Sequence, residues 1–263
     1  MYQTNYVRAK DTNDAVAKLD NEAKILAGGM TLIPTMKHRL ASPAMLVDLA
    51  DCGLAGIEDL GDALKIGAMT RHVDVESSAI VAKSIPALAV LAAKIGDRQV
   101  RNRGTIGGSI ANNDPSACYP SAALALDATI HTNSRDIVAD DFFVGMFETA
   151  LEEDEIIIAI SFSKPTAAAY AKFPNPASRY AMVGVFVARG DSVRVAVTGA
   201  GEDGVFRHAG MEAALTSSFA PESVEPVTVS GDEMISDMHA ASDYRAHLVK
   251  EMTRRAVAAC GQP

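Results

Sequence analysis

Cysteine is scarce in this chain of 263 residues, and its scarcity excludes several kinds of site. Cys52, Cys118 and Cys260 lie far apart, are odd in number and form no C-x-x-C pair. This spacing argues against a disulfide framework, an iron–sulfur cluster or a zinc site encoded by this chain alone. None of the six histidines pairs with another at the spacing of metal ligands. We therefore expect any metal to belong to a partner.

Basic residues are also few: 24 Lys and Arg face 33 Asp and Glu, which gives a formal net charge of −9. This balance argues against a nucleic-acid-binding surface. The longest apolar runs fall well short of the ~18 residues that indicate a membrane span. The N-terminal stretch MYQTNYVRAK lacks the apolar core of a signal peptide. We expect a soluble cytoplasmic protein without a membrane span or a nucleic-acid partner.

Two glycine-containing stretches each lie next to an apolar segment. KILAGGMTLIP carries Gly28 and Gly29 just before an expected helix, and QVRNRGTIGGSIANNDP carries Gly107 and Gly108. Glycine lets backbone N–H groups approach an anion without a Cβ between them, and a helix N-terminus attracts phosphate. Neither stretch is a G-x-G-x-x-G or P-loop motif, and each taken alone also suits a structural turn. Together they indicate the two halves of a diphosphate cradle.

The same stretches carry a family resemblance. AGGMTLIP (27–34) and QVRNRGTIGGSIANNDPSACYP (99–120) resemble the FAD-binding medium subunit of the molybdenum hydroxylases, the group that contains carbon monoxide dehydrogenase and xanthine dehydrogenase. The resemblance continues through DEIIIAI (154–160), KFPNPASRYAMVGV (172–185) and SDYRAHL (242–248), so that it covers essentially the whole chain. It implies that FAD is held noncovalently, with its diphosphate between the two glycine stretches.

The expected fold is α+β. The resemblance implies a two-lobed FAD-binding domain of the vanillyl-alcohol-oxidase (PCMH) type at 1–165, with subdomains at about 1–55 and 56–165. A smaller C-terminal α/β domain at 166–263 follows Pro165 and contains an antiparallel sheet and helices. Apolar patterns and turn residues predict strands at 24–27, 45–49, 57–60, 63–66, 129–131, 137–138, 156–162, 182–188, 193–197 and 205–208. They predict helices at 13–19, capped by Asn13, and at 31–40, 86–95, 120–127, 211–215 and 242–260.

The resemblance also implies the residues that contact FAD. They are Lys24, Leu26, Ala27, Gly28, Gly29, Met30, Thr31, Leu32, Ile95, Thr105, Ile106, Gly107, Gly108, Ser109, Ala111, Asn112, Asp114, Ile156, Ile157, Lys172 and Tyr180. Lys172 matches a family lysine near the flavin ring, where a cation could stabilise negative charge. Tyr180 matches an aromatic residue that covers one face of the isoalloxazine in some members. Ile95, Ile156 and Ile157 also suit a role in the core.

The chain departs from the family pattern at Cys118. The family usually places an acid there, which accepts hydrogen bonds from the ribityl chain of the flavin. A thiol is a weak hydrogen-bonding group, so Asp114 or Asn112 takes over this contact or it is missing. Arg98, Arg101 and Arg103 suit surface charges, or residues that anchor the loop or face an acidic partner.

The implied function is that of an oxidoreductase subunit that transfers electrons within a larger complex. An iron–sulfur small subunit with two-iron, two-sulfur clusters and a large subunit with the molybdenum cofactor would be its partners, in a dimer of heterotrimers. No residue of this chain is then needed as a catalytic group. Two alternatives stay open: a self-contained flavin oxidase or reductase of the same fold, and a non-catalytic assembly subunit. The sequence does not name the substrate of the complex, which could be carbon monoxide, an aldehyde, a purine or another N-heterocycle, or the terminal electron acceptor.

Overall fold

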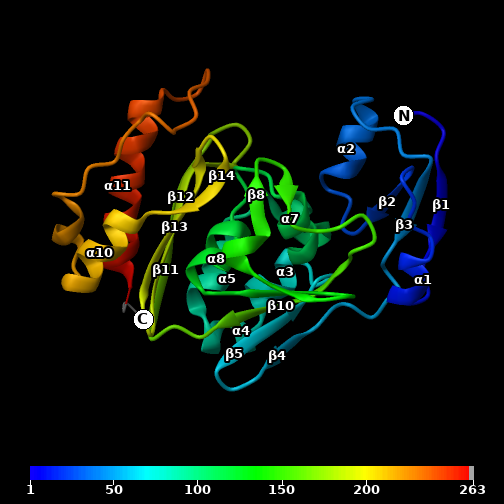
Figure 1. Ribbon diagram of the computed structural model, residues 1–263, viewed down its shortest axis with the longest axis horizontal. Coiled ribbons are helices and arrows are strands. Elements are labelled where there is room, and N and C mark those ends of the chain that lie inside the picture. The colour runs from blue at the N-terminus through cyan, green and yellow to red at the C-terminus, as the bar shows by residue number, and fades with distance from the viewer. Residues whose placement is uncertain (261–263) are drawn as a thin grey trace.

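The N-terminal lobe is built on a small parallel sheet. The computed structural model describes residues 1–260, and in it three strands pair in the order β1 (Asn5–Arg8), β3 (Met45–Asp48) and β2 (Ala23–Leu26). Helices α1 (Thr12–Val16) and α2 (Leu32–Lys37) belong to the same lobe. The lobe has its own core around Ala15, Val47 and Leu49, joined by Ile156 from a later segment. It therefore stands apart on one side of the molecule (Figure 1).

The middle of the chain forms a five-stranded antiparallel sheet covered by helices. Its strand order is β4 (Ile57–Asp59), β5 (Ala63–Gly67), β10 (Ile157–Ser163), β6 (Thr129–Thr132) and β7 (Asp136–Val138). The helices of this part are α3 (His72–Ser77), α4 (Ala79–Ser84), α5 (Pro86–Ala93), α6 (Arg98–Arg103), α7 (Ile106–Asn112), α8 (Tyr119–Ala125) and α9 (Ala139–Phe142). A short hairpin, β8 (Phe143–Gly145) and β9 (Glu148–Thr149), follows α9.

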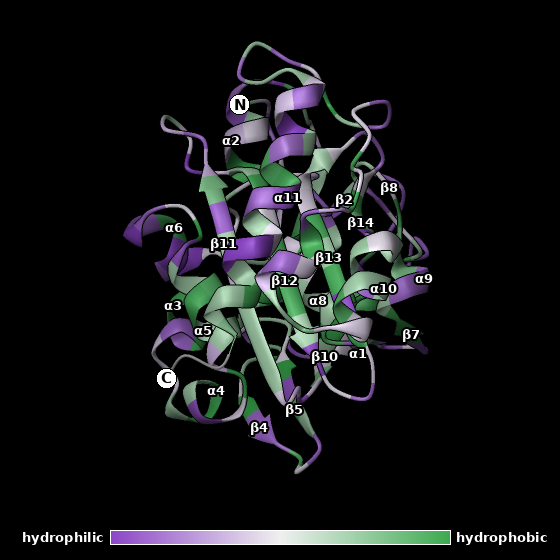
Figure 2. Ribbon diagram, turned by 90° about the vertical axis from the view of Figure 1, so that its left-hand side faces the viewer, coloured by the Kyte–Doolittle hydropathy of each residue, from purple (hydrophilic) through white to green (hydrophobic). Residues whose placement is uncertain are grey.

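The C-terminal part is a four-stranded antiparallel sheet between two layers of helices. The strands are β11 (Ala167–Pro174), β12 (Ala181–Arg189), β13 (Val193–Gly201) and β14 (Gly204–Arg207), in that order. Helices α10 (Ala209–Ser217) and α11 (Ser242–Ala259) cover one face, α5 and α8 contact the other, and a 3-10 turn lies at Pro221–Val224. Apolar β12 and β13 lie beneath α11 in Figure 2.

Strand β12 shows why the centre of this sheet is apolar. Val183, Val185 and Val187 face the C-terminal helices, whereas Phe186 and Ala188 join the core of the middle part. Successive side chains of a strand point to opposite faces, so that a strand covered on both sides is a continuous apolar run. The C-terminal sheet therefore shares its core with the middle part of the chain.

The α+β fold and most of its elements confirm the sequence-based expectation. The parallel βαβ start, the hairpins around Gly61 and Asn133, the antiparallel C-terminal strands and the long last helix are all present. The expected Asn13 cap is wrong, because Asp11 caps α1 by accepting a hydrogen bond from the Asp14 N–H. The glycine stretch at 106–112, expected as a loop, forms a helix. Strands β1, β8, β9 and β11 were not expected.

Two further expectations can be compared with the structure. The domain boundary at Pro165 falls between β10 and β11 but stays a prediction, and the last three residues of the expected C-terminal domain lie outside the described residues. Within residues 1–260, no helix is long and apolar enough to cross a membrane.

Candidate functional site

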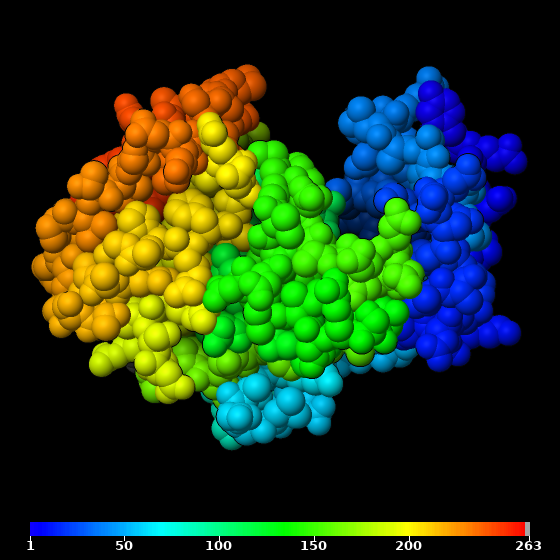
Figure 3. All heavy atoms as spheres, in the orientation of Figure 1, coloured from blue at the N-terminus to red at the C-terminus, as the bar shows by residue number. Residues whose placement is uncertain are grey.

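A cavity of about 800 Å³ lies where the three parts of the chain meet. Its walls come from residues 19–32 of the N-terminal lobe, from residues 95–118 and 151–157 of the middle part, and from residues 172–180 at the start of the C-terminal part. The space-filling view shows a hollow between the N-terminal lobe and the rest of the molecule (Figure 3). A volume of this size suits a large cofactor, since ligand pockets are commonly about 300–1,000 Å³.

The two glycine stretches meet at this cavity by direct backbone contact. A Cβ on Gly28 would lie 2.1 Å from the carbonyl oxygen of Arg103, and a Cβ on Gly107 would lie 2.5 Å from the Ala68 Cβ. Gly108 is less crowded, with the Thr105 Oγ1 at 2.9 Å. Gly28 and Gly107 are thus required because chain segments approach each other closely, which differs from the expected reason of leaving space for a diphosphate.

The two stretches also differ in whether their backbone N–H groups are already hydrogen-bonded within the protein. In the second, the N–H groups of Ile106, Gly107 and Gly108 donate to the Thr70 carbonyl, the Ala68 carbonyl and the Thr105 Oγ1, at 3.0, 2.9 and 3.2 Å. In the first, the N–H groups of residues 28–31 have no acceptor within the described residues. Unsatisfied N–H groups just before a helix are the donors that a phosphate needs. The first stretch can supply backbone donors, and the second contributes the pocket-lining residues Thr105 and Ser109.

The C-terminal sheet holds the segment from Asp114 to Cys118 in place. The Gly199 N–H donates to the Pro115 carbonyl at 2.7 Å, and the Thr198 Oγ1 lies 2.9 and 2.7 Å from the carbonyl oxygens of Pro115 and Ala117. The Asp114 carboxylate accepts from the Ser116 N–H at 2.8 Å, and burial raises the pKa of this carboxyl. The segment therefore presents a partly desolvated acid to the cavity.

A cationic region lies near Cys118. The Lys172 Nζ donates to the Lys94 carbonyl at 2.8 Å and lies 3.4 Å from the Cys118 Sγ. Burial, and then the nearby Lys172 ammonium, lowers the pKa of Lys94. Neither lysine forms an ion pair within residues 1–260. This uncompensated charge suits a ligand that is or becomes anionic at this end of the cavity.

Tyr180 lines the same cavity near Asp114 and Cys118 and is 46% exposed. It follows Arg179, whose φ is +62°, and its carbonyl accepts from the Asn175 N–H at 2.8 Å. Partial burial, and then the Asp114 carboxylate, raises the pKa of the Tyr180 hydroxyl. An aromatic side chain that lines a cavity and remains half exposed has room to stack on a planar ligand.

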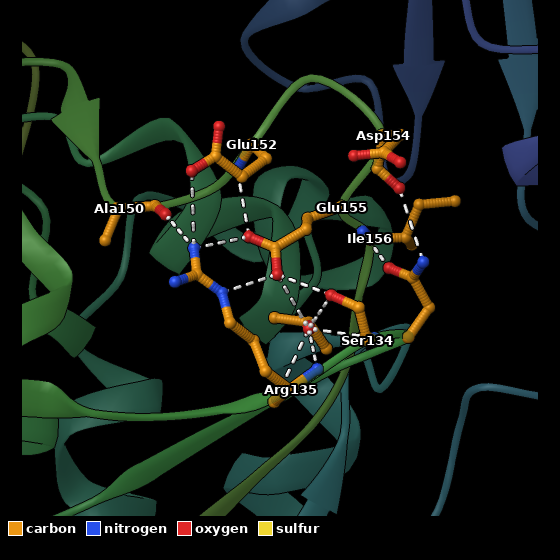
Figure 4. A network of polar contacts seen from close by, with 9 residues as sticks. Ser134, Arg135, Ala150, Glu152, Asp154, Glu155 and Ile156 are labelled. Atoms are coloured by element: carbon orange, nitrogen blue, oxygen red, sulfur yellow. Dashed lines mark hydrogen bonds and ion pairs between the residues drawn. The ribbon is translucent and has the colours of Figure 1, made fainter.

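A polar cluster fixes the wall formed by residues 151–157 (Figure 4). The Arg135 Nε and Nη2 donate to the two oxygens of Glu155 at 2.7 and 2.9 Å, and Nη2 also donates to the Ala150 carbonyl at 2.7 Å. The Ser134 hydroxyl donates to Glu155 at 2.6 Å, as does the Glu152 N–H at 2.9 Å. The Arg135 guanidinium is the main cause that lowers the pKa of Glu155 to about 2.

This cluster predicts that the free energy of unfolding depends on pH. The lowered pKa means that the carboxylate stabilises the fold above its ordinary pKa of 4.5, and that the contribution is lost as the pH falls through about 2. We expect Glu155→Gln to lower the free energy of unfolding by about 2 kcal/mol at pH 6, and by progressively less toward pH 2.5. Urea unfolding at several pH values measures the difference. Glu153→Gln, which removes an exposed acid without an ion pair in the described chain, is the control. A difference that stays constant with pH would contradict this role.

The cavity brings together nearly all the residues expected to contact FAD. The exceptions are Leu26, which lies behind Gly29, and Ile106, which is buried in the core of the middle part. Arg101 pairs with Glu76 at 2.7 Å and donates to the Ile95 carbonyl at 3.1 Å, so that it anchors the segment before the second glycine stretch.

His72 is a cavity residue that the sequence did not reveal. Its side chain is nearly buried, its Nδ1 has no partner within the described chain, and burial lowers its pKa to about 4. Only the fold brings it beside Gly104, since nothing in its neighbouring residues marks a site. Residues 1–260 contain no cluster of three or more His, Cys, Asp or Glu side chains that could hold a metal ion.

Comparisons with known proteins agree with this geometry. Residues 2–165 match the family described as the FAD binding domain in molybdopterin dehydrogenase. The medium subunit of nicotine 6-hydroxylase from Paenarthrobacter nicotinovorans is 36% identical, over 92% of this chain and 91% of that protein. The medium chain of carbon monoxide dehydrogenase from Hydrogenophaga pseudoflava is 35% identical, over 96% of this chain and 95% of that protein.

Solved structures show the same likeness. A chain of carbon monoxide dehydrogenase from Hydrogenophaga pseudoflava superposes with a TM-score of 0.89 at 35% identity, covering 98% of this chain and 97% of that one. Quinoline 2-oxidoreductase from Pseudomonas putida 86 gives a TM-score of 0.88 at 27% identity, covering 98% and 96%. The expected family is confirmed: this chain belongs to the FAD-binding medium subunits of the molybdenum hydroxylases, as an oxidoreductase subunit whose cofactor is FAD.

Proposed function

We propose that this chain is the FAD-carrying electron-transfer subunit of a heteromeric molybdenum hydroxylase. It would accept electrons from an iron–sulfur subunit and pass them to an external acceptor. The observation that carries the proposal is the cavity itself, which joins free N–H groups at residues 28–31 to the cationic region at Lys172 and Lys94. One end suits a diphosphate, and the other suits a flavin ring. Bound FAD supplies the two-electron chemistry, and the protein supplies position and electrostatics.

We assign roles to the cavity residues on this basis. Residues 28–31 would donate to the diphosphate, with Thr105 and Ser109 on the other side. Asp114 would accept hydrogen bonds from the ribityl chain, since its carboxylate lines the cavity and Cys118 offers only a thiol. Lys172 would face the pyrimidine side of the ring. Ile95, Ile156 and Ile157 would provide apolar contacts to the ring systems.

The partners in this proposal are an iron–sulfur small subunit and a large subunit with the molybdenum cofactor, assembled as a dimer of heterotrimers in the cytoplasm. The relatives support a multisubunit setting, since their names specify medium subunits and medium chains. The substrate would bind to the large subunit, so this chain does not select among carbon monoxide, aldehydes, purines and other N-heterocycles. The C-terminal domain at 166–263 would hold the segment at 114–118 against the flavin.

Two experiments separate this function from its alternatives. A visible flavin spectrum of the purified chain distinguishes the electron-transfer subunit from a non-catalytic assembly subunit. Turnover by the chain alone distinguishes it from a self-contained oxidase or reductase. We expect a flavin spectrum without turnover, and either a colourless folded chain or full activity of the isolated chain would contradict the proposal.

Tyr180 gives a further prediction. Stacking on the flavin contributes on the order of 1 kcal/mol, so Tyr180→Ala should retain FAD, with a Kd raised about tenfold or less, and should shift the visible spectrum or the reduction potential. Tyr180→Phe, which keeps the ring, should restore the spectrum. Potentiometric titration and absorption spectra of the two variants check this. Unchanged spectra and reduction potentials in Tyr180→Ala would show that Tyr180 is only a packing residue.

A further inference from the structure

The β8–β9 hairpin exposes three large apolar side chains next to one another in sequence. Val144 is 58% exposed, Met146 is 45% exposed and Phe147 is 57% exposed. The base of the hairpin is secured, because the Phe143 ring packs edge-on against buried Phe142 at 5.1 Å between centroids. A group of exposed apolar side chains on a well-fixed element indicates a contact surface.

The backbone of this tip is held in a costly conformation. Phe147 has a φ of +58°, in the left-handed region that bulky residues rarely adopt. Asn113 stabilises this conformation. Its side-chain Nδ2 donates to the Gly145 and Glu148 carbonyls at 2.8 and 2.9 Å, and its backbone carbonyl accepts from the Phe147 N–H at 3.1 Å. Strain that the surroundings maintain to display an apolar ring to solvent points to a function for that ring.

The same asparagine joins the hairpin to the flavin cavity. Asn113 is buried, ends helix α7 with a φ of +41°, and stands between Asn112 and Asp114, which both line the cavity. Strand β8 accordingly lies beside α7 in Figure 1. A partner seated on the hairpin tip would therefore contact a rigid element that is one residue away from the cavity wall.

Charge restricts the kind of partner. No Lys or Arg occurs between Arg135 and Lys164, whereas eight Asp and Glu residues do. Among them, Asp141, Glu148 and Glu153 are exposed and form no ion pair within the described residues. A second copy of this chain would bring the same acidic surface to the contact, and like charges would repel. The complementary surface is an apolar socket bordered by Lys and Arg.

We propose that the tip Val144–Phe147 is the docking point for the electron-donor subunit of the complex, and that this subunit presents an apolar socket with a basic rim. This inference rests on the proposed function, which requires a donor protein close to the flavin. Insertion of Met146 and Phe147 into the socket would provide the apolar contact, and the acids around the tip would orient the encounter.

The test uses the flavoprotein and the iron–sulfur subunit of its complex. One variant combines Val144→Ser, Met146→Ser and Phe147→Asn. Asparagine is chosen at position 147 because it tolerates the left-handed backbone there. The matched control is Leu60→Ser, an apolar residue that is 48% exposed in the β4–β5 turn at the other end of the molecule. We expect the affinity measured by calorimetry to fall at least about tenfold in the triple variant and to stay unchanged in the control.

A second variant, Asp141→Lys with Glu148→Lys, keeps the proposal falsifiable if the triple variant does not fold. It should weaken binding and flatten the dependence of affinity on salt. FAD content, read from the visible spectrum, should match the wild type in all variants, so that a colourless wild-type chain would contradict the proposed function rather than the docking site. Unchanged affinity in both variants, or a loss of self-association in sedimentation instead of a loss of partner binding, would overturn the docking site.

Discussion

Replacing Gly28 with alanine is expected to weaken FAD binding by about 100-fold, equivalent to about 2.8 kcal/mol, while the chain still folds. The added Cβ would lie 2.1 Å from the carbonyl oxygen of Arg103, a distance that no real contact reaches. Because the neighbouring atoms belong to backbone, the collision can be relieved only by moving one segment away from the other. The N–H groups of residues 28–31 would then leave their place at the cavity wall.

The fold should survive because the N-terminal lobe has a core of its own around Ala15, Val47 and Leu49. The lobe can shift as a unit without exposing the core of the middle part. Fluorescence titration with FAD measures the binding loss, and thermal unfolding of the apoprotein measures stability. Gly190→Ala is the matched control, since its nearest neighbour would be the Pro165 Cα at 4.0 Å.

Gly108→Ala distinguishes two reasons for a glycine in these stretches: close contact between chain segments, and space for the ligand. Its Cβ would meet only the Thr105 Oγ1 at 2.9 Å and the Ala27 Cβ at 3.6 Å, and a hydroxyl can rotate away. We expect a smaller loss of affinity than in Gly28→Ala. Wild-type FAD affinity in folded Gly28→Ala would show that the two stretches can separate without consequence, contrary to this account.

The sequence predicted those elements in which the burial of their own residues leaves a clear apolar pattern. Strand β2 and the pair β4 and β5 were found because apolar residues end at glycines or alternate across a two-residue turn. Strand β1 escaped because three of its four residues are exposed, and β11 escaped because its run of alanines resembles a linker. Both strands exist because a neighbouring strand provides hydrogen bonds, which no local pattern records.

The candidate site was predicted mainly from family resemblance, and the physical reasons came from the fold. Sequence alone could not show that Gly28 is required by Arg103, which is distant in the chain, or that the N–H groups after Thr105 are already bonded. The exposed hairpin tip at Val144–Phe147 also went unnoticed, since its apolar residues are typical of a buried strand. Contacts with distant segments decide the cases of Gly28, Ile106 and Gly107, and the fold decides the exposure of the tip.

The isolated chain, purified with FAD bound, is expected not to be reduced by the substrate of its complex, with a rate lower by on the order of 10³-fold or more than in the complex. The described residues contain no cluster of metal ligands, and the three cysteines lie too far apart in sequence to suggest a shared cluster. The cavity is lined by residues assigned to FAD, so that no further pocket of this chain is assigned to a substrate. In the proposed function, electrons arrive from a neighbouring subunit.

The measurement is anaerobic stopped-flow absorption. The lone flavoprotein and the reconstituted complex are each mixed with carbon monoxide, an aldehyde, a purine and a second N-heterocycle, and the bleaching of the flavin band is followed for the compound that reduces the complex. Dithionite, which does not need a protein partner, is the control that shows the flavin in the lone chain to be reducible. Bleaching only in the complex is the expected result, because in the proposed function the electrons come from a donor subunit that docks on this chain. Bleaching of the lone chain at the rate of the complex would instead identify a self-contained oxidase, and the substrate would then have to bind beside Tyr180 and Lys172, where the cavity remains open to solvent.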